Sequence, residues 1–322
     1  MNKLRSVLRQ SIMEIILLSL CGYLAWKAPG FLTEDNFWNV VRNISMQGII
    51  ALGLTMVIIA GEIDLSVGSA AAFAACLSAW TVEFLTGQKM HWSTPVAVAA
   101  GMMVALIACS GIGCLSGWLR MKFNVPTFIA TLAWMTALRG MAGDITNGFP
   151  MTPFPEWYGF IGGGYVGKIP FPAIVFLAVF AAVQFLMGYT AFGRSVYAVG
   201  GNLEAARLSG INVRRVKIAV MGIVGLLAAL SGLMQSSQIM SGSATMATGW
   251  ELDVISAVII GGTSLLGGAG RVWGTLIGVV FLGVLANGMV LLNVTEYRQL
   301  EVRGALILFA VLINVAPSQK KS

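Results

Sequence analysis

The stretch "GLTMVIIAGEIDLSVGS", Gly53–Ser69, decides the fold, because an apolar run passes through a turn with two carboxylates directly into another apolar run. A carboxylate beside lipid is costly, so Glu62 and Asp64 should face a cavity, a partner or water. The pattern predicts two membrane helices joined by a broken turn that borders a polar pathway or gate. Alternatively, Asp64 or Ser66 caps the following helix and Glu62 rests in cytoplasmic water.

The composition of the whole chain agrees with a membrane protein. Of its 322 residues, 57% are hydrophobic and 10% are charged, and the mean hydropathy is +0.84. Soluble domains carry roughly 25% charged residues, so this chain lacks the polar side chains to cover a water-facing surface. Its apolar runs are also too uniform for barrel strands, which alternate in polarity. We therefore predict an all-α, polytopic fold with one transmembrane domain over residues 1–322.

The apolar segments number about ten, some broken or re-entrant. They lie at 12–28, 44–60, 65–86, 94–118, 125–146, 169–188, 218–240, 250–262, 272–292 and 302–316. The segment 250–262 would make about 20 Å of helix, whereas the hydrocarbon core is roughly 30 Å thick. It cannot span alone, and it runs into the glycine-rich stretch "GGTSLLGGAGR".

The two interrupted segments resemble each other. Val57-Ile58-Ile59 and Gly61 align with Val258-Ile259-Ile260 and Gly262 at an offset of 201 residues. Glycine-interrupted hydrophobic segments at corresponding positions of two halves point to the pathway of a transporter. We expect the turns after both segments to lie near such a pathway.

The basic residues predict the orientation. Placing the amino terminus inside, because Lys3, Arg5 and Arg9 precede the first segment, puts both termini in the cytoplasm. Inside regions then hold most of the twenty Lys and Arg residues: Lys3, Arg5, Arg9, Arg120, Lys122, Arg194, Arg207, Arg214, Arg215, Lys217, Arg271, Lys320 and Lys321. Outside loops hold Lys27, Arg42, Lys89, Lys168 and Arg298. The net charge of +7 thus follows topology, and we expect no nucleic-acid partner because the cations form no basic face.

The sequence shows no motif typical of a catalytic or metal-binding site. The four cysteines lie in apolar segments without Cys-x2-Cys spacing and are interpreted as packing residues: Cys21, Cys76, Cys109 and Cys114. The pair Gly113 and Gly117 is typical of close helix packing. The lone His91 has no catalytic companions, and a phosphate-loop spacing that ends at Lys168 lacks the following Ser or Thr. We expect no catalytic residue, no metal site and no enzymatic activity.

The most polar run, "GGNLEAARLSGINVRR" (200–215), lies in the long inside loop between two apolar segments. Asn202 can cap a short helix that ends at Gly210. The alanine-rich side of this helix suits close contact with a partner, and its charged residues would set orientation. The alternative is an amphipathic helix that lies at the lipid headgroups.

These residues carry a family resemblance. Glu204-Ala205-Ala206-x-x-x-Gly210 resembles the EAA-x3-G loop by which permeases of bacterial ATP-binding-cassette importers dock into their ATPases. Nearly the whole chain resembles the ribose-type sugar permeases. The matching blocks are "GLTMVIIAGEIDLSVGS", "FIATLAWMTALRG", "TNG" (146–148), "GRSVYAVGGNLEAARLSGINVRRVK", "ELDVISAVIIGGTSLLGGAGRVWGTLIG" and "NG" (287–288). One departure is Glu62, where the family commonly has a second glycine.

The resemblance implies a multi-pass permease of the bacterial inner membrane that translocates a pentose-like monosaccharide. The implied partners are a second copy or a paralogue, a cytoplasmic double-cassette ATPase that binds ATP and magnesium, and a periplasmic sugar-binding protein. The chain itself would carry no cofactor. A stand-alone secondary transporter is the alternative, although candidate intramembrane charges such as Glu14, Arg139 and Asp144 are sparse.

Two sets of functional residues follow. The ATPase-coupling set is Asn202, Glu204, Ala205, Ala206, Arg207, Ser209 and Gly210. The pathway or gate set is Glu62, Asp64, Ser66, Asn147, Gly261, Gly262, Thr263, Ser264, Gly267 and Gly268.

Overall fold

The computed structural model describes residues 12–88 and 90–315. Their long helices are α2 (Ile12–Lys27), α3 (Glu34–Ile59), α4 (Val67–Thr86), α5 (Thr94–Phe123), α6 (Thr127–Ile145), α8 (Phe171–Tyr189), α11 (Val213–Ile239), α13 (Val272–Leu291) and α14 (Glu296–Val315). The shorter elements are η1 (Glu156–Gly159), α7 (Phe160–Gly163), β1 (Tyr165–Val166), β2 (Ile169–Pro170), α9 (Ala191–Gly201), α10 (Leu203–Leu208) and α12 (Trp250–Ile260).

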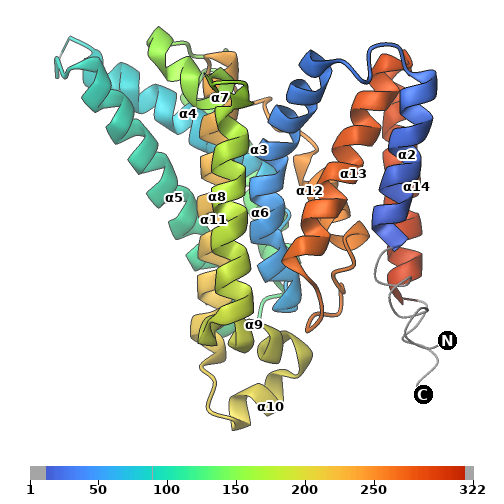
Figure 1. Cartoon of the computed structure of the whole chain (residues 1–322). Coiled ribbons are helices and arrows are strands. Elements are labelled where there is room, and N and C mark those ends of the chain that lie inside the picture. Colours follow the sequence, from blue (N-terminus) through green and yellow to red (C-terminus); the bar gives the residue numbers. More distant parts are fainter. Residues whose placement is uncertain (1–11, 89, 316–322) are drawn as a thin grey trace.

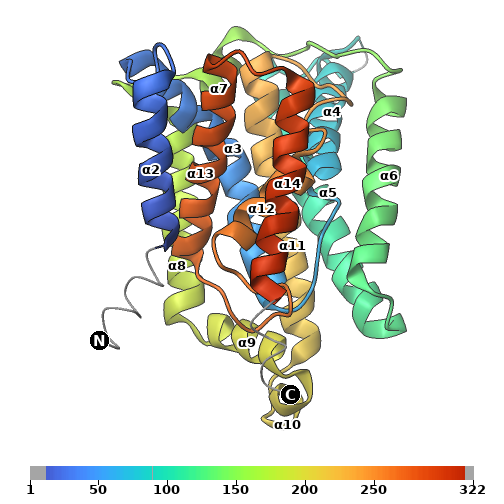
Figure 2. The ribbon, with the colours of Figure 1, turned by 90° about the vertical axis from the view of Figure 1, so that its right-hand side faces the viewer.

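The long helices form one bundle, with α10 projecting from one end (Figure 1). Each of the ten predicted apolar segments contains a helix, and the all-α, polytopic class is confirmed. Six of the described helices are long and apolar enough to cross a membrane. The described chain begins and ends at the end of the bundle that carries α10 (Figures 1 and 2).

Several helices begin before their apolar segments do. Helix α3 starts at Glu34 instead of residue 44, α11 at Val213 instead of 218, and α14 at Glu296 instead of 302. The added turns are rich in polar side chains, most of them exposed, which lower the hydropathy without ending the helix. Of the Lys and Arg residues from which the membrane orientation was predicted, several lie outside the residues that the structure describes: Lys3, Arg5, Arg9, Lys89, Lys320 and Lys321.

The helix α11 packs closely against α5, α4 and α3. At its contact with α5, a Cβ on Gly113 would overlap the Met221 carbonyl oxygen, and a Cβ on Gly117 would lie 2.8 Å from Ile218 Cα. The predicted close packing at this glycine pair is confirmed. Cys109 lies in the same contact and is buried, which agrees with its interpretation as a small packing residue.

The half-length helix α12 follows an irregular segment, residues 240–249. Irregular backbone at membrane depth must find its hydrogen-bond partners within the protein. Arg139 of α6 supplies them, because its Nη1 donates to the carbonyl oxygens of Ala244 at 2.5 Å and Met246 at 2.7 Å. Arg139 therefore serves to hold this segment between helices.

The two turns that align in sequence have the same backbone geometry. After α3, Gly61 N–H donates to Ile58 O and Glu62 N–H to Val57 O. After α12, the equivalent bonds run from Gly262 to Ile259 and from Thr263 to Val258. Both glycines have positive φ, +77° and +88°, as this helix-ending motif requires. The offset of 201 residues thus reflects two structurally equivalent turns.

Candidate coupling surface and polar cavity

The helix α10 forms as predicted. Asn202 Oδ1 accepts from the Ala205 N–H at 2.9 Å and caps its start. Gly210 ends it with φ +80°, while the Gly210 and Ile211 N–H groups return to the carbonyls of Arg207 and Ala206. A side chain at position 210 would strain this turn. The positive φ at this turn therefore explains why the EAA-x3-G pattern ends in glycine.

The outer surface of α10 is open. Ala206 is buried and fixes the helix to the bundle, while Glu204, Ala205 and Arg207 are exposed. Leu208, the last residue of this projecting helix, is 87% exposed. Leu208 is not among the predicted residues, although an apolar side chain within a polar loop is a sequence signal for it. We name the exposed residues Glu204, Ala205, Arg207 and Leu208 the coupling surface.

The end of α9 joins the coupling surface to both broken turns. A Cβ on Gly200 would overlap the Ile59 carbonyl oxygen and lie 2.7 Å from the Gly268 nitrogen. That nitrogen donates to Ile59 O at 2.8 Å. A Cβ on Gly267 would lie 3.0 Å from Gly61 Cα. We call this meeting of three backbones the glycine junction.

A buried ion cluster lies beside the glycine junction. Glu62 is 4% exposed and Lys217, near the start of α11, is 3% exposed. Glu62 Oε1 accepts from Lys217 Nζ and, at 3.1 Å, from Arg120 Nε in the last turn of α5. The other carboxylate oxygen accepts from the Thr127 hydroxyl at the start of α6. One carboxylate therefore connects the turn after α3 to three helices.

The alternative in which Glu62 rests in water is wrong, because cations of α5 and α11 enclose it. Asp64 bonds to Ser66, the residue before α4, and not to a backbone N–H within that helix. Its Oδ1 accepts from the Ser66 N–H at 2.8 Å and from the Ser66 hydroxyl at 2.6 Å, just before α4 begins. Ser66 itself makes no side-chain cap bond to α4.

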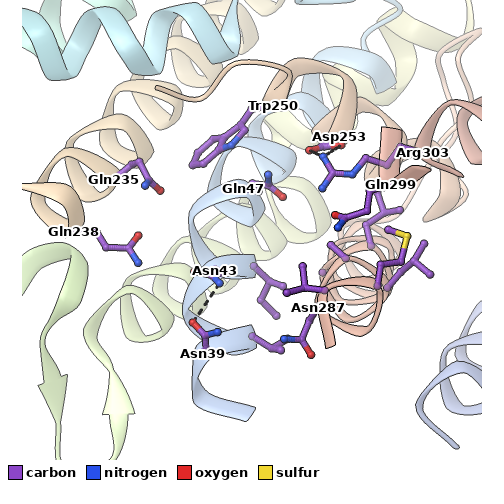
Figure 3. Close-up of a pocket in the computed structure, with 18 of the residues that line it drawn as sticks. Asn39, Asn43, Gln47, Gln235, Gln238, Trp250, Asp253, Asn287, Gln299 and Arg303 are labelled. Carbon is purple, nitrogen blue, oxygen red and sulfur yellow. Dashed lines mark hydrogen bonds and ion pairs between the residues drawn. The ribbon is translucent and has the colours of Figure 1, made fainter. Parts of the chain in front are cut away.

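A polar cavity of about 630 Å³ lies in the half of the bundle remote from α10. It is formed by α3, α11, α12, α13 and α14 (Figure 3). Its polar lining residues are Asn39, Asn43, Gln47, Gln235, Gln238, Trp250, Asp253, Asn287, Gln299 and Arg303. The volume lies within the roughly 300–1,000 Å³ that small-molecule sites occupy.

Contacts among the lining residues fix their positions. Arg303 Nη1 of α14 donates to Asp253 of α12, with distances of 3.0 and 3.3 Å to the two carboxylate oxygens. Asn287 of α13 exchanges amide hydrogen bonds with Asn36 of α3 at 2.8 and 3.1 Å. Gln235 and Gln238 of α11 lie across the space from the amides of α3 (Figure 3).

The predicted pathway residues, all within the described chain, do not line this cavity. Gly261, Gly262, Thr263, Ser264, Gly267 and Gly268 form the turn and loop after α12, and the last two belong to the glycine junction. Asn147 ends α6 with φ +49° and borders a separate hollow with Trp80 and Glu83. The contribution of these residues to a pathway stays a prediction.

The cavity residues are not among the predicted ones, although their spacing in the sequence is a signal for them. Asn39, Asn43 and Gln47 recur every four residues, which places them on one face of a helix. Gln235 and Gln238 are three apart and share a face of α11. Polar stripes on otherwise apolar membrane helices indicate a polar interior.

A helical bundle with paired broken turns and a polar cavity defines a solute permease of the membrane. The chain belongs to the family described as the branched-chain amino acid transport system / permease component, whose model matches residues 36–311.

Curated relatives cover nearly the same length. The ribose import permease protein RbsC of Escherichia coli (strain K12) is 42% identical over 93% of this chain and 92% of its own. A probable ABC transporter permease protein, YphD, of the same strain is 42% identical over 99% and 94%. The xylose transport system permease protein XylH, also of this strain, is 32% identical over 96% and 92%. No solved structure matches.

Proposed function

We propose that this chain is the membrane-spanning permease subunit of an ATP-binding-cassette importer for a pentose-like monosaccharide. The cargo class is supported by the relatives, among them a ribose and a xylose permease that match most of this chain. In this proposal the ten helical segments lie in the bacterial inner membrane, and the α10 end of the bundle, with both termini, lies in the cytoplasm.

The partners follow from the same proposal. A double-cassette ATPase would bind ATP and magnesium and dock on the coupling surface. A periplasmic binding protein would deliver sugar at the opposite end, and a second permease copy or a paralogue would complete the membrane part. This chain would act as a transport subunit and leave hydrolysis to the ATPase.

The observation that carries the coupling role is the exposure of α10. A leucine that is 87% exposed on a projecting, capped helix needs a partner to cover it. Behind it, α9 contacts both broken turns at the glycine junction. A push on α10 would therefore reach the two turns as a rigid-body displacement.

Coupling is tested by Leu208→Ser and Glu204→Lys. Both variants should insert normally, yet uptake of D-ribose or D-xylose by cells that express the complete importer should fall about tenfold or more, because few residues dominate a docking surface. The ATPase should also co-purify less well with both variants.

The matched control is Leu32→Ser, since Leu32 is 78% exposed in the turn between α2 and α3, at the opposite end of the bundle. It should leave ATPase co-purification unchanged. Normal uptake and normal co-purification by both α10 variants would argue against the coupling assignment. Absence of uptake of any monosaccharide by the unsubstituted importer would argue against the cargo class.

A further inference from the structure

We infer that the polar cavity between α3, α11, α12, α13 and α14 binds a neutral, polyhydroxylated solute of monosaccharide size. The inference rests on the proposed function for its cargo, and it assigns to that cargo a site in this chain.

Amides make up most of the polar part of the cavity wall. Seven of its lining residues are Asn or Gln, namely Asn39, Asn43, Gln47, Gln235, Gln238, Asn287 and Gln299. An amide side chain donates from its NH₂ and accepts at its oxygen. A sugar hydroxyl also does both, so a ring with several hydroxyls matches this wall without requiring any charged group. Such residues within an apolar bundle are costly unless they face water or a ligand.

The charge of the cavity selects against ions. Among the described residues, its charged lining residues are Asp253 and Arg303, and they neutralise each other in a close ion pair. An anionic solute would compete with Asp253 for Arg303, and a cationic solute would compete with Arg303 for Asp253. A neutral solute leaves the pair intact and can use its remaining hydrogen-bonding capacity.

An aromatic side chain in the cavity wall suits a sugar ring. Trp250 begins α12 and lies beside the cavity with Gln235 and Gln47 near it (Figure 3). The flat apolar surface of an indole complements the C–H face of a sugar ring, while neighbouring amides meet the hydroxyls at its edge. The combination of one aromatic surface and many amides fits a polyol better than a purely apolar solute.

The position of Trp250 also relates the cavity to the coupling surface. Helix α12 runs from Trp250 to Ile260, about 16 Å at 1.5 Å per residue, and its far end is the turn at Gly261 and Gly262. The loop that follows enters the glycine junction. An occupant beside Trp250 and the docked ATPase would therefore act on opposite ends of one short helix.

The test is sugar uptake by the complete importer carrying Gln235→Leu, compared with the control Gln184→Leu on α8, outside the cavity. The Gln235 variant should insert normally. Its half-saturating sugar concentration should rise, or its maximal uptake should fall, by about tenfold for the loss of one or two hydrogen bonds. Gln184→Leu should behave as the unsubstituted chain.

A second measurement, cysteine labelling at position 43, is independent of whether the Gln235→Leu variant folds. Asn43→Cys should react with a membrane-impermeant maleimide from outside the cell, above the labelling of the unsubstituted chain. Saturating D-ribose or D-xylose should protect this cysteine, whereas gluconate, a charged analogue, should not.

The possible results distinguish a failure of the cavity assignment from a failure of the proposed function. Normal uptake by Gln235→Leu, no labelling of Asn43→Cys, or labelling that no sugar changes would overturn the cavity assignment while leaving the proposed function in place. Equal protection by gluconate would overturn the selection for neutral solutes. An unsubstituted importer that transports and binds neither sugar would overturn the proposed function and this inference with it.

Discussion

Gly200→Ala is expected to abolish most transport while leaving the protein in the membrane. The added methyl would overlap the Ile59 carbonyl oxygen and approach the Gly268 nitrogen to 2.7 Å, and both neighbours are backbone atoms. Backbone cannot yield as the end of a flexible side chain can, so the Gly268–Ile59 hydrogen bond should break. We expect uptake to fall by about tenfold or more, equivalent to at least about 1.4 kcal/mol in the transport barrier.

The control for this variant is Gly188→Ala at the same end of the bundle. A Cβ at Gly188 would meet only Gln184 Nε2, at 3.8 Å, which is an ordinary contact. Both variants should reach the membrane in equal amounts. Equal uptake by Gly200→Ala and Gly188→Ala would show that the glycine junction plays no part in coupling.

Glu62→Ala is expected to destabilise the protein by about 3–5 kcal/mol, because it leaves the ammonium of Lys217 buried without its carboxylate. Arg120 is less affected, since its side chain is partly exposed and also donates to Asn124 Oδ1. Thermal unfolding of the purified protein in detergent micelles should show a clearly lowered midpoint.

Two further variants separate this effect from a general sensitivity to charge removal. Glu34→Ala removes the carboxylate of an exposed ion pair with Lys168, and such pairs contribute about 0–1 kcal/mol. The double variant Glu62→Ala with Lys217→Met removes both buried charges and should recover most of the loss. A midpoint for Glu62→Ala equal to that for Glu34→Ala would contradict the buried cluster.

The sequence predicted the helices well where the bundle faces lipid or packs apolar side chains. Hydropathy located every segment, and the shared glycine pattern identified two turns with the same hydrogen bonds. It failed at helix ends that are rich in polar side chains. Helix α3 begins at Glu34 although Asn39 and Asn43 lower its hydropathy, because these amides line the cavity. A helix wall that faces such a space does not need apolar side chains.

The functional residues could be predicted where they are close together in the sequence, but not where the tertiary fold brings distant residues together. Helix α10 is local in sequence, so its cap at Asn202 and its end at Gly210 could be predicted from spacing alone. The Glu62 cluster joins residues up to 155 positions apart, and no periodicity connects Glu62 with Lys217. The Asp253–Arg303 pair joins α12 to α14 and likewise requires the tertiary fold.

The glycine junction restricts how such permeases can be recombined. The loop that presents α10 ends inside the bundle, where Gly200 and Gly201 meet Ile59 and Gly268 without any intervening side chain. A chimaera that exchanges only α10 would preserve this fit and, if the proposed docking holds, would redirect the chain to another ATPase. An exchange that begins at α9 must preserve both glycines, or bring the two matching turns from the same donor.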